Sequence, residues 1–253
     1  MLVKIFISMF LVMVSPFCGS GLASAGEELL VSAAASLTDS FKAIGRAYEV
    51  KNPGIKILFN FAATGPLLQQ IEQGAPADVF ASANQKFMDK AENGGFIQPG
   101  SRTDFTGNSL VLISPLNMTV VKGLADLQSA QVLRISTGNP DSVPAGKYAK
   151  AALEKQGLWE TLVPKFVMGN SVRQVLEYVM RGEVEAGFVY GTDVVIAKDK
   201  VRVVAEIPTT KPIVYPVAIV AASAKKEQAQ AFIDYLLSAE GQSILVQYGF
   251  KKL

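Results

Sequence analysis

Four short segments combine small or hydroxyl residues with Gly or Pro at expected strand-to-helix junctions: 33–39 (AAASLTD), 62–66 (AATGP), 143–146 (VPAG) and 170–173 (NSVR). Each junction would direct free backbone N–H groups and the positive end of a helix dipole toward the carboxyl edge of a sheet. Ligands of α/β folds bind at that edge, and helix N-termini are ready sites for anions. The four junctions together therefore indicate an anion site.

The same residues also have a purely structural interpretation, because every helix needs a start signal. Ser, Thr and Asn are preferred capping residues, and Pro is favoured at the first helical position. The expected start signals are Ser36 with Asp39 in a capping-box pattern, Pro66 and Pro144 at first helical positions, and Asn170 or Ser171 as a cap. For a single junction this interpretation is the stronger one, so the functional hypothesis depends on all four.

A ligand held by neutral donors alone should be an anion that carries no proton of its own. Each charge-assisted hydrogen bond contributes roughly 1.5–3 kcal/mol, so several donors are needed to offset the desolvation of a dianion. Hydrogen phosphate would need an acceptor, and Asp39 is the one carboxylate in the four segments. Its expected capping role would occupy it. The pattern therefore favours a fully ionised tetrahedral dianion.

The composition excludes several classes of protein. The chain has 253 residues, 49% of them hydrophobic and 18% charged, which rules out intrinsic disorder and allows a sizeable core. A formal net charge of +2 argues against nucleic acid or an anionic membrane as the main partner. The sequence contains no histidine, so Ser-His-Asp triads, His-dependent zinc sites and histidine proton shuttles are excluded.

Residues 1–25 have the three-part pattern of a secretory signal peptide: Lys4, an apolar stretch at 5–14, and small residues before a cut near Ala25-Gly26. The apolar stretch is too short for a transmembrane helix. The single cysteine, Cys18, lies inside this segment, and bulky Phe17 before it disfavours lipid attachment. We therefore expect an exported mature protein without thiols, located in the periplasm of a double-membraned bacterium.

Short β-branched runs alternate with amphipathic stretches, which is typical of an α/β protein with mainly parallel sheets. Strands are expected at 29–33, 55–61, 78–81, 110–114, 132–136, 165–168, 186–190, 201–207 and 214–222. Helices are expected from residue 37 onward and at 66–73, 85–93, 144–156, 172–181, 227–237 and 240–248.

The order of these elements indicates two similar α/β lobes joined by two crossover segments. The crossings are expected at 107–109 and at 208–212, and Pro216 beyond the second favours an edge or crossover strand. Lobe I would comprise 26–107 and 214–253, and lobe II would be the inserted segment 108–213.

Several segments spread over the mature chain match a known family: AAASLTD at 33–39, FAATG with QQIEQGAPADVFASA at 61–83, GNSLVLI at 107–113, VPAGKYAKAAL at 143–153, SVRQVLEYV at 171–179, GFVYGTD at 187–193 and YPVAIV at 215–220. With these motifs in this order, the chain resembles the periplasmic molybdate-binding proteins of ABC-type molybdate transporters, in the type II periplasmic binding protein superfamily. The resemblance implies a two-lobed α/β fold, each lobe a mainly parallel sheet flanked by helices.

In that family, molybdate lies between the lobes and accepts hydrogen bonds from hydroxyls and main-chain amides, with no cationic side chain. The resemblance implies that Ser36, Thr64, Ala145, Val172 and Tyr190 contact the ligand here, with molybdenum bound only as its oxyanion. Thr64 departs from the serine of many members, keeping the donor and adding a methyl. By position alone, Tyr190 at the end of an apolar strand would be a core residue.

The resemblance further implies an extracytoplasmic solute-binding protein that captures molybdate, or tungstate of nearly equal size and charge. It would deliver this ligand to the permease and ATPase of an ABC transporter, as a monomer without cofactor, nucleic-acid partner or catalytic activity. Asp78 and Arg173, although inside the motifs, are interpreted as structural or surface residues.

Three alternatives are weighed against this hypothesis. One is a binder of another tetrahedral oxyanion such as sulfate. A second is an enzyme, since porphobilinogen deaminase shares the general fold, but its cofactor attaches through a cysteine that the mature chain lacks. The third, an adhesin, predicts a large exposed apolar patch and no cleft.

Overall fold

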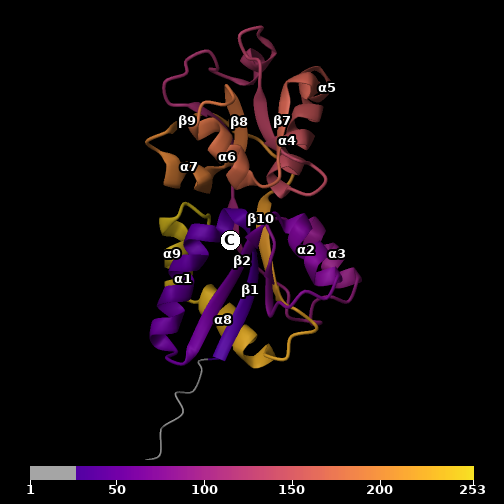
Figure 1. Cartoon of the computed structure of the whole chain (residues 1–253), viewed down its shortest axis with the longest axis vertical. Coiled ribbons are helices and arrows are strands. Elements are labelled where there is room, and N and C mark those ends of the chain that lie inside the picture. Colours follow the sequence, from indigo (N-terminus) through magenta and orange to yellow (C-terminus); the bar gives the residue numbers. More distant parts are fainter. Residues whose placement is uncertain (1–26) are drawn as a thin grey trace, which may run out of the picture.

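A computed structural model of the chain describes residues 27–253. It shows two lobes stacked along the long axis of the molecule, each with a sheet between helices (Figure 1). The predicted signal peptide at 1–25 lies outside the described residues.

The first lobe contains a five-stranded sheet of order β2-β1-β3-β10-β4. Its strands are β1 (Glu27–Ala34), β2 (Ile55–Ala62), β3 (Val79–Ala81), β4 (Thr103–Asn108) and β10 (Ile213–Ile219). Its helices are α1 (Thr38–Lys51), α2 (Thr64–Glu72), α3 (Gln85–Asn93), α8 (Lys226–Leu237) and α9 (Ala239–Gln247), with a 3₁₀ turn, η1 (Ala35–Leu37), before α1.

The second lobe contains a five-stranded sheet of order β7-β6-β8-β5-β9. Its strands are β5 (Leu110–Pro115), β6 (Ile135–Gly138), β7 (Phe166–Gly169), β8 (Ala186–Tyr190) and β9 (Val201–Ile207). Its helices are α4 (Pro144–Lys155), α5 (Trp159–Leu162), α6 (Val172–Met180) and α7 (Gly191–Ala197), with 3₁₀ turns η2 (Leu124–Gln128) and η3 (Val163–Lys165).

The two sheets share one topology. β1 pairs in parallel with β2 and β3, as β6 does with β7 and β8. β10 in the first sheet and β5 in the second run antiparallel to both of their neighbours. Each of these two strands is the one that enters directly from the other lobe. The predicted class, two similar and mainly parallel α/β lobes, is confirmed.

The chain changes sheets twice in this structure. It passes from β4 to β5 through Ser109, and from β9 to β10 through 208–212. Both α8 and α9, near the C-terminus, return to the first lobe beside α1 (Figure 1). The predicted lobe boundaries at 107/108 and 213/214 fall beside the two passages and stay a prediction.

Among the strands and α-helices of residues 27–253, the sequence pattern missed three: β4, α5 and α7. β4 has the sequence TDFTGN, in which one apolar residue cannot show a period, and α5 is a single turn of four residues. α7 follows β8 without any intervening turn signal.

Pro216 lies in β10 between β3 and β4. The pairing with β4 shifts register at Tyr215/Pro216, where the proline has no N–H to donate.

The helices pack closely on the sheets, and one contact is closer than any side chain would allow. Gly146, in the first turn of α4, faces the end of β6, and a Cβ built on it would lie 1.9 Å from the carbonyl oxygen of Gly138. This glycine therefore sets how near the start of α4 comes to the sheet edge.

We predict that Gly146→Ala destabilises the protein, because the added methyl forces α4 away from β6. The expected cost is about 2–3 kcal/mol, or a melting temperature lower by roughly 5–10 °C. Gly123→Ala is the matched control, since no atom lies within 4 Å of a Cβ added there. Equal melting temperatures for the two variants, measured by circular dichroism, would contradict the prediction.

Candidate functional site

The five residues predicted to contact the ligand line one small cavity between the lobes. Ser36 and Thr64 come from the first lobe, and Ala145, Val172 and Tyr190 from the second. All five are buried. The other lining residues are Ala34, Ala35, Ala63, Ala83, Val143 and Pro144, so within residues 27–253 the lining has no charged side chain.

Three helices begin at this cavity. Thr64 and Val172 are the first residues of α2 and α6, and Ala145 is the second residue of α4. Backbone N–H groups in the first turn of a helix have no carbonyl of a preceding turn to bind. Together with the positive ends of the helix dipoles, they give the cavity the character of an anion site without any cation.

The predicted capping box of Ser36 and Asp39 is wrong. The 3₁₀ turn η1 follows β1 directly and moves the start of α1 to Thr38, so Leu37 is its N-cap and no side chain caps it. The Ser36 hydroxyl instead lies 3.0 Å from the Tyr215 hydroxyl, and Asp39 forms an ion pair with Arg173. Ser36 is thereby held at the cavity by a residue 179 positions away.

The other start signals give a mixed outcome. Ser171 caps α6, accepting a hydrogen bond from the Gln174 amide at 3.2 Å, and Pro144 is the first residue of α4, as predicted. Pro66 is the third residue of α2 and not the first. Its missing N–H is still harmless in the first turn, and the earlier start brings the Thr64 amide into the helix terminus.

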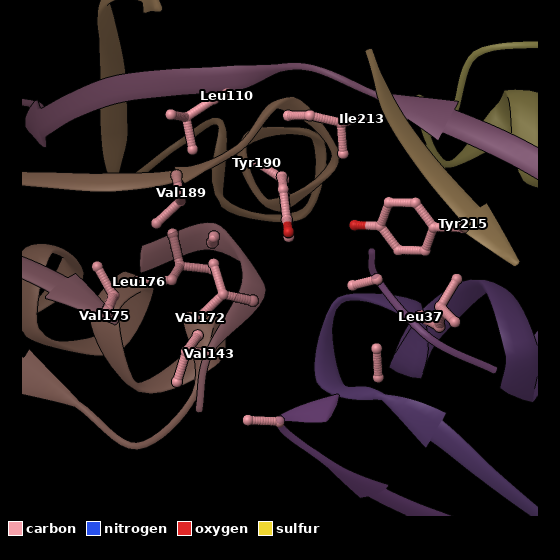
Figure 2. Close-up of a cluster of buried hydrophobic side chains, with 14 of the residues drawn as sticks. Leu37, Leu110, Val143, Val172, Val175, Leu176, Val189, Tyr190, Ile213 and Tyr215 are labelled. Carbon is pink, nitrogen blue, oxygen red and sulfur yellow. The ribbon is translucent and has the colours of Figure 1, made fainter. Parts of the chain in front are cut away.

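Tyr190 and Tyr215 direct their hydroxyl oxygens toward the same space (Figure 2). In the described part of the chain, the buried Tyr190 hydroxyl has no hydrogen-bond partner. Burial raises its pKa well above the ordinary value, so it remains a neutral donor. Tyr190 is a core residue by packing, and its free hydroxyl is a polar group that an oxyanion in the cavity would satisfy.

Sequence reasoning missed two polar residues behind the cavity, Tyr215 and Asn108. The Asn108 side-chain amide donates to the Tyr215 hydroxyl at 3.2 Å and to the Thr192 hydroxyl at 3.0 Å. Both residues lie at the crossings between the lobes, and both stand inside the motifs GNSLVLI and YPVAIV. The available signal was a polar residue beside an apolar run: Asn108 shortly before LVLI at 110–113, and Tyr215 at the start of YPVAIV.

Comparison with known proteins shows the family to which this chain belongs. A family model described as bacterial extracellular solute-binding protein matches residues 29–251. The chain belongs to this family. It is 40% identical over 239 residues to the molybdate-binding protein ModA of Escherichia coli K12, covering 92% of this chain and 91% of the relative.

Solved structures agree with this assignment. The periplasmic molybdate-binding protein of Azotobacter vinelandii superposes with a TM-score of 0.76 at 26% identity, covering 88% of this chain and 98% of that one. The sulfate-binding protein SubI of Mycobacterium tuberculosis H37Rv gives 0.81 at 17% identity, covering 90% and 87%, and shows the shared type II periplasmic binding protein fold. No helix within residues 27–253 of this solute-binding protein is long and apolar enough to cross a membrane.

Arg173 joins the two lobes of this solute-binding protein. From α6 its guanidinium lies 2.8 Å from Asp39 Oδ2 in the first lobe and 3.0 Å from Asp193 Oδ1 in the second. It also donates to the Ser36 carbonyl at 3.4 Å. A second link is the Gly65 amide, which donates across the lobes to the Ser142 carbonyl at 3.0 Å. The interpretation of Arg173 as structural is right, and its place is between the lobes.

The two carboxylates bound by Arg173 differ in environment. Asp193 is fully buried, and burial raises its pKa to about 6 although Arg173 acts in the opposite direction. Its other oxygen accepts a hydrogen bond from the Tyr190 amide at 3.0 Å. The Asp39 side chain is 39% exposed. Arg173 therefore compensates a buried negative charge directly behind the cavity.

We predict that Arg173→Gln costs more stability at pH 8 than at pH 5. Losing the guanidinium removes a cause that lowers the Asp193 pKa, so this pKa rises further above its unfolded value of about 4. Between the two values the folded state binds the proton more tightly, so the free energy of unfolding falls as pH rises. At pH 8 an unpaired carboxylate must be buried, which costs about 2 kcal/mol or more.

Urea unfolding at the two pH values measures this difference. Arg102→Gln is the control, because Arg102 pairs with the exposed Asp89 and Glu92 within the first lobe and should cost about 1 kcal/mol or less. A penalty for Arg173→Gln that is the same at both pH values would show that Asp193 does not need the guanidinium.

Proposed function

We propose that this solute-binding protein captures molybdate, or tungstate, in the cavity between its lobes. The observation that carries the proposal is the convergence of three helix N-termini and three hydroxyls on a cavity whose lining, within residues 27–253, has no charged side chain. Such a site stabilises an anion by oriented dipoles alone.

Each predicted contact has a definite role in this proposal. The hydroxyls of Ser36, Thr64 and Tyr190 donate to oxygens of the anion, and so do the amides of Ala145 and Val172. Charge-assisted hydrogen bonds contribute about 1.5–3 kcal/mol each, so five of them exceed the several kcal/mol needed to desolvate the anion. Thr64 supplies the same donor as a serine and carries one methyl group more.

Molybdate is favoured over sulfate by the relatives. The named molybdate-binding proteins share 40% and 26% identity with this chain, whereas the sulfate-binding protein shares 17%. An enzymatic role has no support in the site, because Ser36 bonds to a tyrosine and Thr64 to a backbone amide, and neither partner is a base that would activate a nucleophile.

The remaining parts of the proposal concern location and partners. We infer an exported monomer in the periplasm, with residues 1–25 removed, which delivers the oxyanion to the permease and ATPase of an ABC-type transporter. The two lobes, divided at 107/108 and 213/214, close around the ligand, and no cofactor takes part.

We predict that molybdate and tungstate stabilise the protein against heat. At a ligand concentration about 1,000 times the Kd, the gain is about 4 kcal/mol, or roughly 10 °C in melting temperature. Differential scanning calorimetry with molybdate, tungstate and sulfate at equal concentration measures it. A rise with sulfate and none with molybdate would overturn the proposed ligand.

We predict that Ser36→Ala raises the Kd for molybdate roughly 10- to 100-fold, because one charge-assisted donor is lost. Isothermal titration calorimetry measures the change. Ser40→Ala is the matched control, since Ser40 is an equally buried serine whose hydroxyl donates to the Leu37 carbonyl at 3.1 Å. If both variants bound molybdate as the wild type does, Ser36 would not be a contact.

A further inference from the structure

The hydrogen-bond directions behind Ser36 follow from the orientation of Asn108. The Asn108 carbonyl oxygen, Oδ1, accepts from the Ser109 amide at 2.9 Å. A flipped side chain would set two donors against each other there, so the orientation is determined. The amide nitrogen, Nδ2, must then face Thr192 and Tyr215 and donate to both.

The next bond joins the hydroxyls of Tyr215 and Ser36, and either oxygen has a hydrogen that it can donate. The Tyr215 hydroxyl has one hydrogen, and it already accepts a hydrogen bond from Asn108 Nδ2 at 3.2 Å. Its own hydrogen can go to Ser36 Oγ, which lies 3.0 Å away. Both side chains are buried, with Tyr215 fully enclosed, so water does not compete for this hydrogen.

When Tyr215 donates, Ser36 receives a hydrogen bond from behind and keeps its own hydrogen for the cavity. Hydrogen bonds in such a chain polarise one another, so Ser36 becomes a better donor than an isolated serine. We call the series Asn108, Tyr215, Ser36 the donor relay. It begins at the crossing between β4 and β5, passes through β10 at the second crossing and ends at the cavity.

The Thr64 hydroxyl, the second one that the first lobe brings to the cavity, also accepts a hydrogen bond from behind. Thr64 Oγ1 accepts a hydrogen bond from the Ala83 amide at 3.2 Å, which leaves its hydrogen free. The carboxylates near the cavity are also engaged, since Asp39 and Asp193 both pair with Arg173. Both hydroxyls of the first lobe can thus donate into the cavity.

We infer that Tyr215 is a specificity-determining residue: it orients Ser36 as a donor and so selects oxyanions without a proton. This inference rests on the proposed function. A fully ionised dianion offers acceptors to every donor in the cavity. A dianion that carries one proton, such as hydrogen phosphate, would aim its O–H at a group already committed to donating, and would lose that hydrogen bond.

The test compares three anions on wild-type protein and Tyr215→Phe at about pH 8. Molybdate and sulfate carry no proton there, and phosphate is mainly the dianion with one proton. Calorimetry gives the Kd for molybdate, and competition against molybdate gives those for sulfate and phosphate. Without the relay, the Kd for molybdate should rise about fivefold, and the preference for molybdate over phosphate should fall at least about tenfold.

Sulfate distinguishes two explanations of the Tyr215→Phe result: a changed orientation of the Ser36 donor and a changed shape of the cavity. Because sulfate has no proton, its Kd should rise by the same factor as that of molybdate. Tyr48→Phe is the control, since it removes a hydroxyl from another buried tyrosine of the first lobe that packs on Phe232 outside the cavity. It should leave all three Kd values unchanged.

A second variant tests the direction of the relay. Asn108→Asp replaces the donating nitrogen by an acceptor, so Tyr215 would donate to it and Ser36 would donate to Tyr215, away from the cavity. This substitution should raise the Kd for molybdate. The factor by which it raises the Kd should be at least about fivefold larger in the wild-type protein than in the Tyr215→Phe variant. This comparison cancels the direct repulsion between the new carboxylate and the anion.

The outcomes distinguish the two proposals. If the wild type does not bind molybdate, the proposed function fails. If it binds molybdate but Tyr215→Phe changes all three Kd values by one factor, or if the effects at positions 108 and 215 are simply additive, Tyr215 only fills space and the donor relay is overturned.

Discussion

Three helix N-termini meet at one cavity, and most other features of the structure serve to bring them there. Thr64 begins a helix of the first lobe. In the second lobe, Val172 begins α6 and Ala145 is the second residue of α4. Unpaired amides at a helix terminus need either water or an anion. The residues that line the cavity are buried, and the two lobes face each other there with the carboxyl edges of their sheets, a geometry that the shared sheet topology provides.

Charge is kept out of the cavity but not far from it. Arg173 holds two carboxylates and a carbonyl between the lobes, so it connects them without offering its guanidinium to the ligand. On the outer side, Lys86 of α3 and Lys147 of α4 face each other, and burial and this like charge lower the pKa of Lys147 to about 8. One charged contact thus draws the lobes together, and another opposes their approach.

The two crossings connect the lobes and also carry polar groups to the site. Asn108 ends β4 at the first crossing, and Tyr215 stands in β10 just after the second. A movement of the lobes about these segments would therefore act on the same hydrogen bonds that orient Ser36. Asn108 and Tyr215 would therefore affect both the movement of the lobes and the choice of ligand.

The sequence by itself determined the local features of this protein, alternating strands and helices and most helix starts, because periodicity and capping are interactions among near neighbours. The five lining residues came from the resemblance of its motifs to a known family and not from local periodicity. The tertiary structure alone decided that Ser36 bonds to Tyr215 instead of capping α1, and that Asp39 pairs across the lobes with Arg173. Partners 179 and 134 positions away leave no local pattern, since their proximity results from how two sheets pack and where the chain crosses between them.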